Sequence, residues 1–496
     1  MVLSMTRGTE SIIRDAILRK ELEELTNRQA AFKQFRDYFD GEQPLAFSTE
    51  LFQKVFGSAF AGFKDNWMRP IVDVVQDKML LEGFKAREDD AQSAIEKVWE
   101  AFLLNDIDEE MFNLHESALV EGQSFMIVWP DDELGVTIDH QPAGLVRVRY
   151  DNDRRRKALW ALKRWQTDEG AIFVTIYTPT DAWKFVQRDE NDANLQASSK
   201  NALLEIPNIG FVSGLTQRDV PDEPFPLPHS FGEVPVVELN NPSYRSELKD
   251  AIPQQDALNK VLLDLLVATE FSAVPQKWIE MMGNEPVGGW KTGAGQVWHI
   301  KPGFDSDGKA VQAQAGEFTA ASPDVFLKTI EMFLQHIAFT SRTPVRYFLQ
   351  SDRGGRGDSP SGESLQVEDK PLNDKVARKQ RQWGNRHVQV ARLVSTQLDG
   401  VNPSVMRLAE PVWQDPRYDF RLAVLTEAVQ MIAVGLPFKW VIRQMNLTQA
   451  EISEIEKLKE KELEEQRAEQ KADLSMQKEF QPDPTTGAGS PSSATS

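Results

Sequence analysis

The chain has 496 residues, of which 41% are hydrophobic and 27% are charged, a composition typical of a protein that folds around a hydrophobic core. Its 76 acidic and 56 basic residues give a net charge of −20, which argues against a protein that wraps DNA on a basic face. Because it has no cysteine, disulfide bonds, thiolate metal sites and cysteine nucleophiles are excluded.

The length of the chain predicts two to four domains, at roughly 150 residues per domain. No apolar segment approaches the ~18–20 residues of a membrane span, and Asp264 interrupts the best candidate at 261–268. The N-terminus lacks the continuous hydrophobic stretch of a secretory signal. We therefore expect no membrane partner.

The first 240 residues are predicted to pass from helices to strands. Apolar residues at helical spacing predict helices over 9–39 and 67–81, and the segment 91–129 begins as helix and turns strand-like at 124–129. Short β-type stretches follow, separated by Asp, Asn, Gly and Pro turns, at 145–150, 158–165, 172–177 and 234–239. The polar, proline-rich stretch 188–230 is predicted to be an exposed excursion.

The middle of the chain is predicted to form two helices that bracket a small β-rich module. The first helix covers 246–272, with Pro253 near its start. Strand-like pieces at 276–281 and 296–300 and six glycines between Gly283 and Gly303 indicate the module. Ser322 and Pro323 then form an N-cap with proline at the first helical position, which opens a helix to about residue 341.

A loop rich in glycine, arginine and aspartate at 351–358 precedes a predicted long helix over 359–398, which we expect to kink near Pro371. Further helices are predicted over 420–434 and 449–475, the latter with a capping box at Thr448 and Glu451. Residues 480–496 are predicted to be a disordered tail. Two basic clusters are interpreted as solvent-exposed faces, namely 154–157 (RRRK) and the set Lys375, Arg378, Lys379 and Arg381.

Motifs for catalysis are missing from the sequence. The segment most similar to a phosphate-binding loop is 289–292 (GWKT), which has tryptophan where glycine is needed. The six histidines are scattered, with no pair at i+3 or i+4 spacing, and Gly-x-Ser-x-Gly does not occur. We therefore predict a protein that is not an enzyme and holds no metal or cofactor.

The order of several short motifs resembles that of the portal, or head-to-tail connector, proteins of tailed double-stranded-DNA bacteriophages. Each motif is weak alone, and their order over about 30–440 carries the resemblance. The motifs are 38–43 (YFDGEQ), 66–72 (NWMRPIV), 78–84 (KMLLEGF), 118–122 (ALVEG), 128–131 (VWPD), 232–240 (GEVPVVELN), 246–248 (SEL), 256–260 (DALNK), 273–275 (AVP), 343–344 (TP) and 361–365 (SGESL).

The resemblance implies an α+β, mainly α-helical portal fold with wing, stem, clip and crown regions. The β-rich pieces would lie in the wing and the clip. The implied regions are a wing at 1–245, stem helices at 246–272 and 322–341, a clip at 273–321, a tunnel loop at 342–358, a long wing helix and return at 359–419, a crown at 420–479, and the tail at 480–496.

The resemblance also implies a function in the virion. Portal proteins form rings, dodecamers in the virion, at one capsid vertex, and DNA passes through the ring during packaging and ejection. The implied partners are other copies of the chain, double-stranded DNA, the terminase packaging motor, a head-tail adaptor, and the major capsid and scaffolding proteins. Assembly would take place in the host cytoplasm.

Four arginines near the predicted tunnel loop are candidates for transient phosphate contacts, namely Arg342, Arg346, Arg353 and Arg356. Two other readings stay open at this point. One is a different structural virion component, such as a minor head or adaptor protein. The other is an enzyme subunit of the packaging machinery, which predicts a phosphate-binding motif or a carboxylate cluster.

Overall fold

The computed structural model describes most of the chain in segments. They are residues 7–44, 63–86, 91–168, 170–187, 205–206, 210–211, 215–218, 223–273, 277–280, 303–304, 307–311, 314–317, 322–349, 362–415, 421–444 and 455–467. Helices and antiparallel strands both occur in these segments, which confirms the predicted α+β class. None of the described helices is long and apolar enough to cross a membrane.

The N-terminal helices cover one side of the body. They are α1 (Arg7–Asp40), α3 (Arg69–Gln76), α4 (Gln92–Leu104) and α5 (Ile107–Glu121). The helix predicted over 67–81 is too long, because α3 ends at Gln76 and the chain continues as strand β1 (Leu81–Lys85). β1 pairs with β17 (Glu410–Trp413), more than 300 residues later, and local periodicity carries no signal for such a partner.

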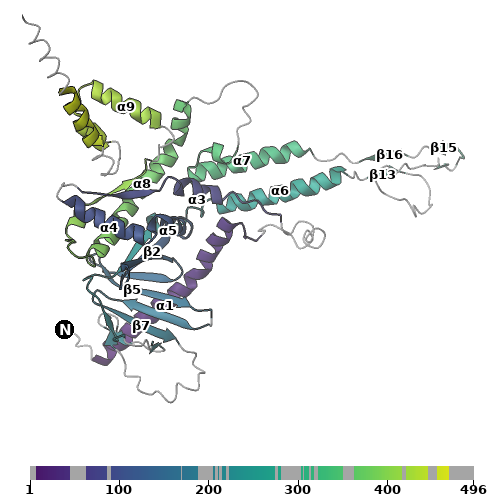
Figure 1. The fold of residues 1–496 in the computed structure, drawn as a ribbon. Coiled ribbons are helices and arrows are strands. Elements are labelled where there is room, and N and C mark those ends of the chain that lie inside the picture. The colour runs from purple at the N-terminus through teal and green to yellow at the C-terminus, as the bar shows by residue number, and fades with distance from the viewer. Residues whose placement is uncertain are drawn as a thin grey trace, which may run out of the picture.

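Two larger antiparallel sheets follow. The first has the order β12–β2–β3, and the second the order β10–β7–β6–β5–β4 with β11 also paired to β7. Leu22 of α1 packs against the second sheet beside Trp160 and Leu162, and α1 crosses this sheet in Figure 1. The bounds are β2 (Gln123–Asp131), β3 (Gly135–Pro142), β4 (Val146–Tyr150), β5 (Ala158–Gln166), β6 (Ile172–Tyr177), β7 (Asp181–Gln187), β10 (Leu215–Gln217), β11 (Leu227–Pro228) and β12 (Val236–Asn240).

The four predicted strand stretches between 145 and 239 are thus confirmed within two residues at each end. The excursion 188–230 is described only in part. Its described pieces include a two-stranded ladder of β8 (Glu205–Ile206) and β9 (Gly210–Phe211), and β10 and β11 extend the second sheet. A short 3-10 turn, η3 (Pro242–Tyr244), follows β12.

A pair of helices forms an arm that projects from the body (Figure 1). It consists of α6 (Ile252–Ala273) and α7 (Pro323–Ser341), which lie side by side. α6 begins six residues later than predicted, because 246–251 forms turns in which the Ser246 hydroxyl accepts a hydrogen bond from the Leu248 amide. α7 begins as predicted, with the Ser322 hydroxyl accepting from the Asp324 amide at 3.4 Å.

Short strand ladders follow α6 and precede α7 in the sequence, and they lie beyond the far ends of the two arm helices in Figure 1. β13 (Lys277–Glu280) pairs with β16 (Gln314–Glu317), and β14 (Gly303–Phe304) with β15 (Ala310–Val311). The strand predicted at 276–281 is therefore present as β13. The strand predicted at 296–300 lies outside the described residues.

Helix α8 (Gly362–Ser395) runs through the body and contains Pro371. Gly384 does not interrupt it. A Cβ at this glycine would lie 2.6 Å from Cγ of Pro411, so the missing side chain lets β17 approach the helix closely. Two 3-10 turns flank α8, η4 (Val345–Tyr347) before it and η5 (Val405–Leu408) after it.

The C-terminal helices are α9 (Arg421–Ala433), α10 (Phe438–Gln444) and a helix at 455–467. The predicted capping box at Thr448 and Glu451 and the predicted tail at 480–496 lie outside the described residues. The main hydrophobic core lies between α3, α4, α5, β2 and α8. Its largest fully buried side chains include Trp383, Phe39 and Phe102.

Candidate functional site at the junction of the arm and the long helix

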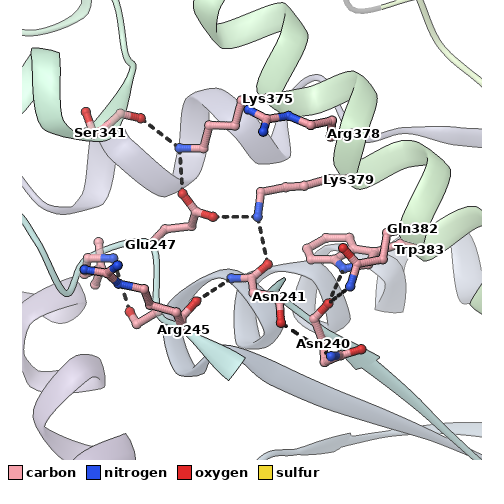
Figure 2. Close-up of polar contacts among 12 residues, drawn as sticks. Asn240, Asn241, Arg245, Glu247, Ser341, Lys375, Arg378, Lys379, Gln382 and Trp383 are labelled. Carbon is pink, nitrogen blue, oxygen red and sulfur yellow. Dashed lines mark hydrogen bonds and ion pairs between the residues drawn. The ribbon is translucent and has the colours of Figure 1, made fainter. Parts of the chain in front are cut away.

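A carboxylate that is largely shielded from solvent, with its side chain 18% exposed, joins the arm to α8. Glu247 lies in the turns before α6, and its two oxygens accept from Lys375 at 2.7 Å and from Lys379 at 2.6 Å (Figure 2). Lys375 also donates to the backbone oxygen of Ser341, the last residue of α7, at 3.0 Å. One cluster of charges therefore fixes the base of both arm helices to the same face of α8.

The charges of this cluster support one another electrostatically. Burial alone would raise the pKa of Glu247, but attraction to Lys379 and Lys375 outweighs burial and lowers the pKa to about 2. Because the pKa lies below its ordinary value of 4.5, the contribution to stability is complete above about pH 4.5 and is lost as the pH falls toward 2. Burial lowers the pKa of Lys379, and the Glu247 charge opposes that shift.

The same network reaches the first sheet. Lys379 donates to Oδ1 of Asn241 at 2.7 Å, and Gln382 and Trp383 both donate to the backbone oxygen of Asn240, the last residue of β12. Figure 2 shows these groups converging from α8 onto the end of the strand. The arm, the long helix and the sheet are thereby held in one fixed arrangement.

This cluster corrects one interpretation of the sequence. Lys375 and Lys379 are not on a solvent-exposed face, because they are buried against Glu247. Their i, i+4 spacing places them on one side of the helix, and that spacing was the available signal. Glu247 lies in the motif 246–248, but neither Glu247 nor Asn241 was predicted to bind the lysines, because nothing local marks them as partners. Arg378 and Arg381, in contrast, are exposed as expected, and so is the stretch 154–157.

The structure separates the four candidate arginines. Arg342 ends α7 in the left-handed conformation, with φ of 57°, and its side chain is exposed. Arg346 instead donates to the buried carboxylate of Asp369 at 2.6 Å and stacks on the Tyr347 ring. It therefore ties the segment after α7 to α8. Arg353 and Arg356 lie outside the described residues.

An open groove of about 1430 Å³ lies between the end of α7 and the first half of α8. Ala338, Phe339, Pro344, Pro371 and Ala377 give it apolar walls. Its charged lining residues are Arg342, Glu368, Lys370, Asp374, Arg378 and Arg381. The groove is thus apolar within and mainly basic at its margin.

A second buried polar contact lies between α5 and α8. Nε2 of His115 and Nε2 of His387 are 3.1 Å apart, although the residues are 272 positions apart in the sequence. Burial lowers the pKa of His115 well below its ordinary value and that of His387 to about 3, so both rings are neutral. Among the described residues, no group of three or more His, Asp or Glu side chains is arranged to hold a metal ion.

An arm fixed to an α+β body at its base, with the exposed apolar side chains Val325 and Phe339 on α7, has the features of a component that assembles with other subunits. The sequence comparison makes the class specific. The family described as "Phage portal protein, SPP1 Gp6-like" matches residues 26–468, and the chain belongs to this family. This confirms the resemblance recognised in the sequence. Members of the family are structural, non-enzymatic components of the phage virion.

Two relatives carry the name "Portal protein". That of Mycobacterium phage D29 is 26% identical over 413 residues, which cover 79% of this chain and 78% of the relative. That of Mycobacterium phage L5 is 26% identical over 373 residues, covering 70% and 68%. A chain of a solved structure titled "Virion of native gene transfer agent (GTA) particle" aligns with a TM-score of 0.38 and 12% identity, covering 80% of this chain and 93% of that one.

Proposed function

We propose that this portal protein forms a ring at one capsid vertex, through which double-stranded DNA enters during packaging and leaves during ejection. The observation that carries the proposal is the arm, whose helices have more apolar surface than one chain covers. Val325, Met332 and Phe339 recur at seven-residue spacing along α7 and are 65%, 42% and 87% exposed. Such a stripe is the pattern by which one helix packs on another.

The second arm helix supports the same proposal. The second half of α6 is rich in apolar residues, yet Val261, Leu265 and Leu266 are only half-buried. A helix with apolar residues all round is normally buried on all sides. Because the uncovered faces belong to two different helices, the arm of one copy would pack on a different face of the next. Contacts of this head-to-tail kind close into rings when the rotation between copies allows it.

The proposal also assigns each region of the ring to elements of the chain. The N-terminal helices and the two sheets would form the wing, and α6 and α7 the stem. The short strands β13 to β16 would belong to the clip, α8 would be the long wing helix, and the helices after 420 the crown. In this arrangement the clip would meet the terminase motor and later the head-tail adaptor. The wing would meet the capsid and scaffolding proteins during assembly in the host cytoplasm.

The charge of the chain suits a conduit that does not hold DNA. Twelve copies at −20 each would carry −240, which repels phosphate. Arg342 at the exposed end of α7, together with Arg353 and Arg356, would supply brief, sequence-independent phosphate contacts. Arg346 would act mainly through its ion pair with Asp369, which ties the start of the segment after α7 to α8.

The test is the amount of DNA in particles assembled with variant subunits. Arg342→Gln, Arg353→Gln and Arg356→Gln combined should leave ring formation unchanged and alter the packaging or retention of DNA. Arg155→Gln, on an exposed turn of the second sheet, is the matched control. Unchanged DNA content in the triple variant would refute the role of these arginines. A purified wild-type protein that forms no ring would refute the conduit itself.

A further inference from the structure

The groove beside α8 has a matching surface elsewhere on the same chain. α4 ends in two exposed leucines, Leu103 at 45% and Leu104 at 58%, and Phe112 on α5 is 40% exposed. Asp108 and Glu109 at the start of α5 are also exposed. Asp132 and Glu133 lie at the tip of the β2–β3 hairpin next to Leu134, which is 41% exposed. We call Leu104, Asp108, Glu109, Phe112, Asp132 and Glu133 the acidic corner.

Two hydrogen bonds connect the end of α4 to the hairpin of the acidic corner. Asn105, between α4 and α5, donates to the backbone oxygen of Val136 at 3.0 Å and accepts from the Ile138 amide at 3.0 Å. These bonds hold the end of α4 against the hairpin that carries Asp132 and Glu133. An exposed apolar patch with a charged margin is typical of a protein interaction site.

The groove has the opposite charge and a similar apolar interior. On the outer face of α8, Pro371, Arg378 and Arg381 are exposed at spacings of seven and three residues. Phe339, at 87% exposure, forms the facing wall. Arg378 donates from Nε to the backbone oxygen of Asp374 in its own helix and is one of the residues that line the groove. Apolar walls, together with Glu368 and Asp374 in the lining, favour a protein occupant over the phosphate backbone of DNA.

We propose that the acidic corner of one copy docks into the α7–α8 groove of its neighbour, with Asp108 and Glu109 facing Arg378 and Arg381. The two surfaces share no residue. Every copy can therefore dock its acidic corner into the groove of one neighbour and accept the acidic corner of the other neighbour in its own groove, as a closed ring requires. The proposal rests on the ring proposed above and adds a charged contact to the apolar contacts of the arm. Phe339 ends the apolar stripe of α7 and also lines the groove, so one neighbouring copy would cover both.

The first experiment uses cross-linking, for which a chain without cysteine is well suited. Leu104→Cys and Phe339→Cys replace two exposed side chains, and purified protein carrying both is treated with a short bis-maleimide in the absence of DNA. We expect a ladder of covalent multimers, whereas each single variant gives at most dimers. Leu104→Cys combined with Arg155→Cys is the matched control. The same ladder from this control, or no ladder from assembled protein, would overturn the docking.

The second experiment reverses the charges. Arg378→Glu with Arg381→Glu should raise the concentration needed for half-assembly by at least about tenfold, because like charges then face each other. Adding Asp108→Arg with Glu109→Arg to the same chain should restore much of the loss. Unchanged assembly in all variants, with rings still formed by the wild type, would overturn this contact alone. If the wild type itself forms no ring, the proposed function and this contact fail together.

Discussion

Lys375 and Lys379 lie in the same short stretch of α8 as Arg378 and Arg381, yet the two pairs lie in opposite environments. The lysines are buried on the inner face of α8 and share one carboxylate, whereas the arginines are exposed beside a groove. A cation on the inner face therefore acts on the stability of a single chain. A cation on the outer face is available for contacts between chains, so the same kind of residue serves two purposes on one helix.

The largest effect expected from this comparison is the loss of Glu247. Glu247→Ala leaves two buried ammonium groups without their carboxylate, and we expect it to lower the free energy of unfolding by about 3–5 kcal/mol. Urea denaturation at fixed protein concentration measures the change. Glu23→Ala, the same substitution at an exposed site on α1, should have an effect within about 0.5 kcal/mol. Equal urea midpoints for the two variants would show that the cluster of Glu247, Lys375 and Lys379 does not hold the arm.

The histidine pair on the inner face predicts a dependence of stability on pH. The folded state keeps His387 neutral down to about pH 3, whereas its ordinary pKa is 6.5, so the unfolded chain binds protons first as the pH falls. Stability should therefore decrease between pH 6.5 and pH 3, by an amount on the order of a few kcal/mol. Urea midpoints measured between pH 7.5 and pH 5 test the start of this decrease. His387→Gln should flatten the profile in that range, and an identical slope in the variant would contradict the assignment.

A third face of α8 is packed against β17, and a substitution at Gly384 tests how closely the two elements pack. Gly384→Ala places a methyl group 2.6 Å from Cγ of Pro411, which is too close without a shift of the strand. We expect a loss of about 1–3 kcal/mol, as for other overpacked sites. Gly144→Ala is a useful control, since the nearest atom would be 3.8 Å away. Thermal unfolding that is equally affected in both variants would count against close packing of β17 on the helix.

The smallest effect is expected at Arg378, which lies next to Lys379 in the sequence but on another face of α8. Arg378→Gln should change the unfolding free energy by no more than about 0.5 kcal/mol, because it is exposed. Lys379→Gln should cost about 1–3 kcal/mol, because it removes a buried charged hydrogen bond. Urea denaturation of the two variants side by side gives the difference. Similar losses in both would remove the distinction between the inner and outer faces.

Local signals in the sequence were sufficient for the start of α7 and for several strands. α7 begins at the serine–proline pair predicted to open it, and the strands between 145 and 239 follow their alternating apolar residues. The pairing of β1 with β17 was not predictable in this way, because it joins segments that are distant in the sequence. The length of α3 was overestimated for the same reason, since Leu81 continues an apolar pattern that belongs to a strand.

The sequence predicted the candidate site less completely than it predicted the fold. Basic residues on α8 were recognised, but only tertiary packing decides that Lys379 points inward and Arg378 outward. Likewise, Arg346 was grouped with Arg342 by proximity in the chain, and the structure separates them because Asp369 binds only the former. Which face of a helix meets the core is a property of the whole fold.

The most direct test of the account is electron microscopy of the purified wild-type protein, followed by reconstruction of the assembly. We predict a ring with a central channel in which Val325 and Met332 of one arm contact the α6 helix of the next. A population of monomers under the same conditions would contradict it. A ring in which the stripe on α7 faces solvent would contradict it equally.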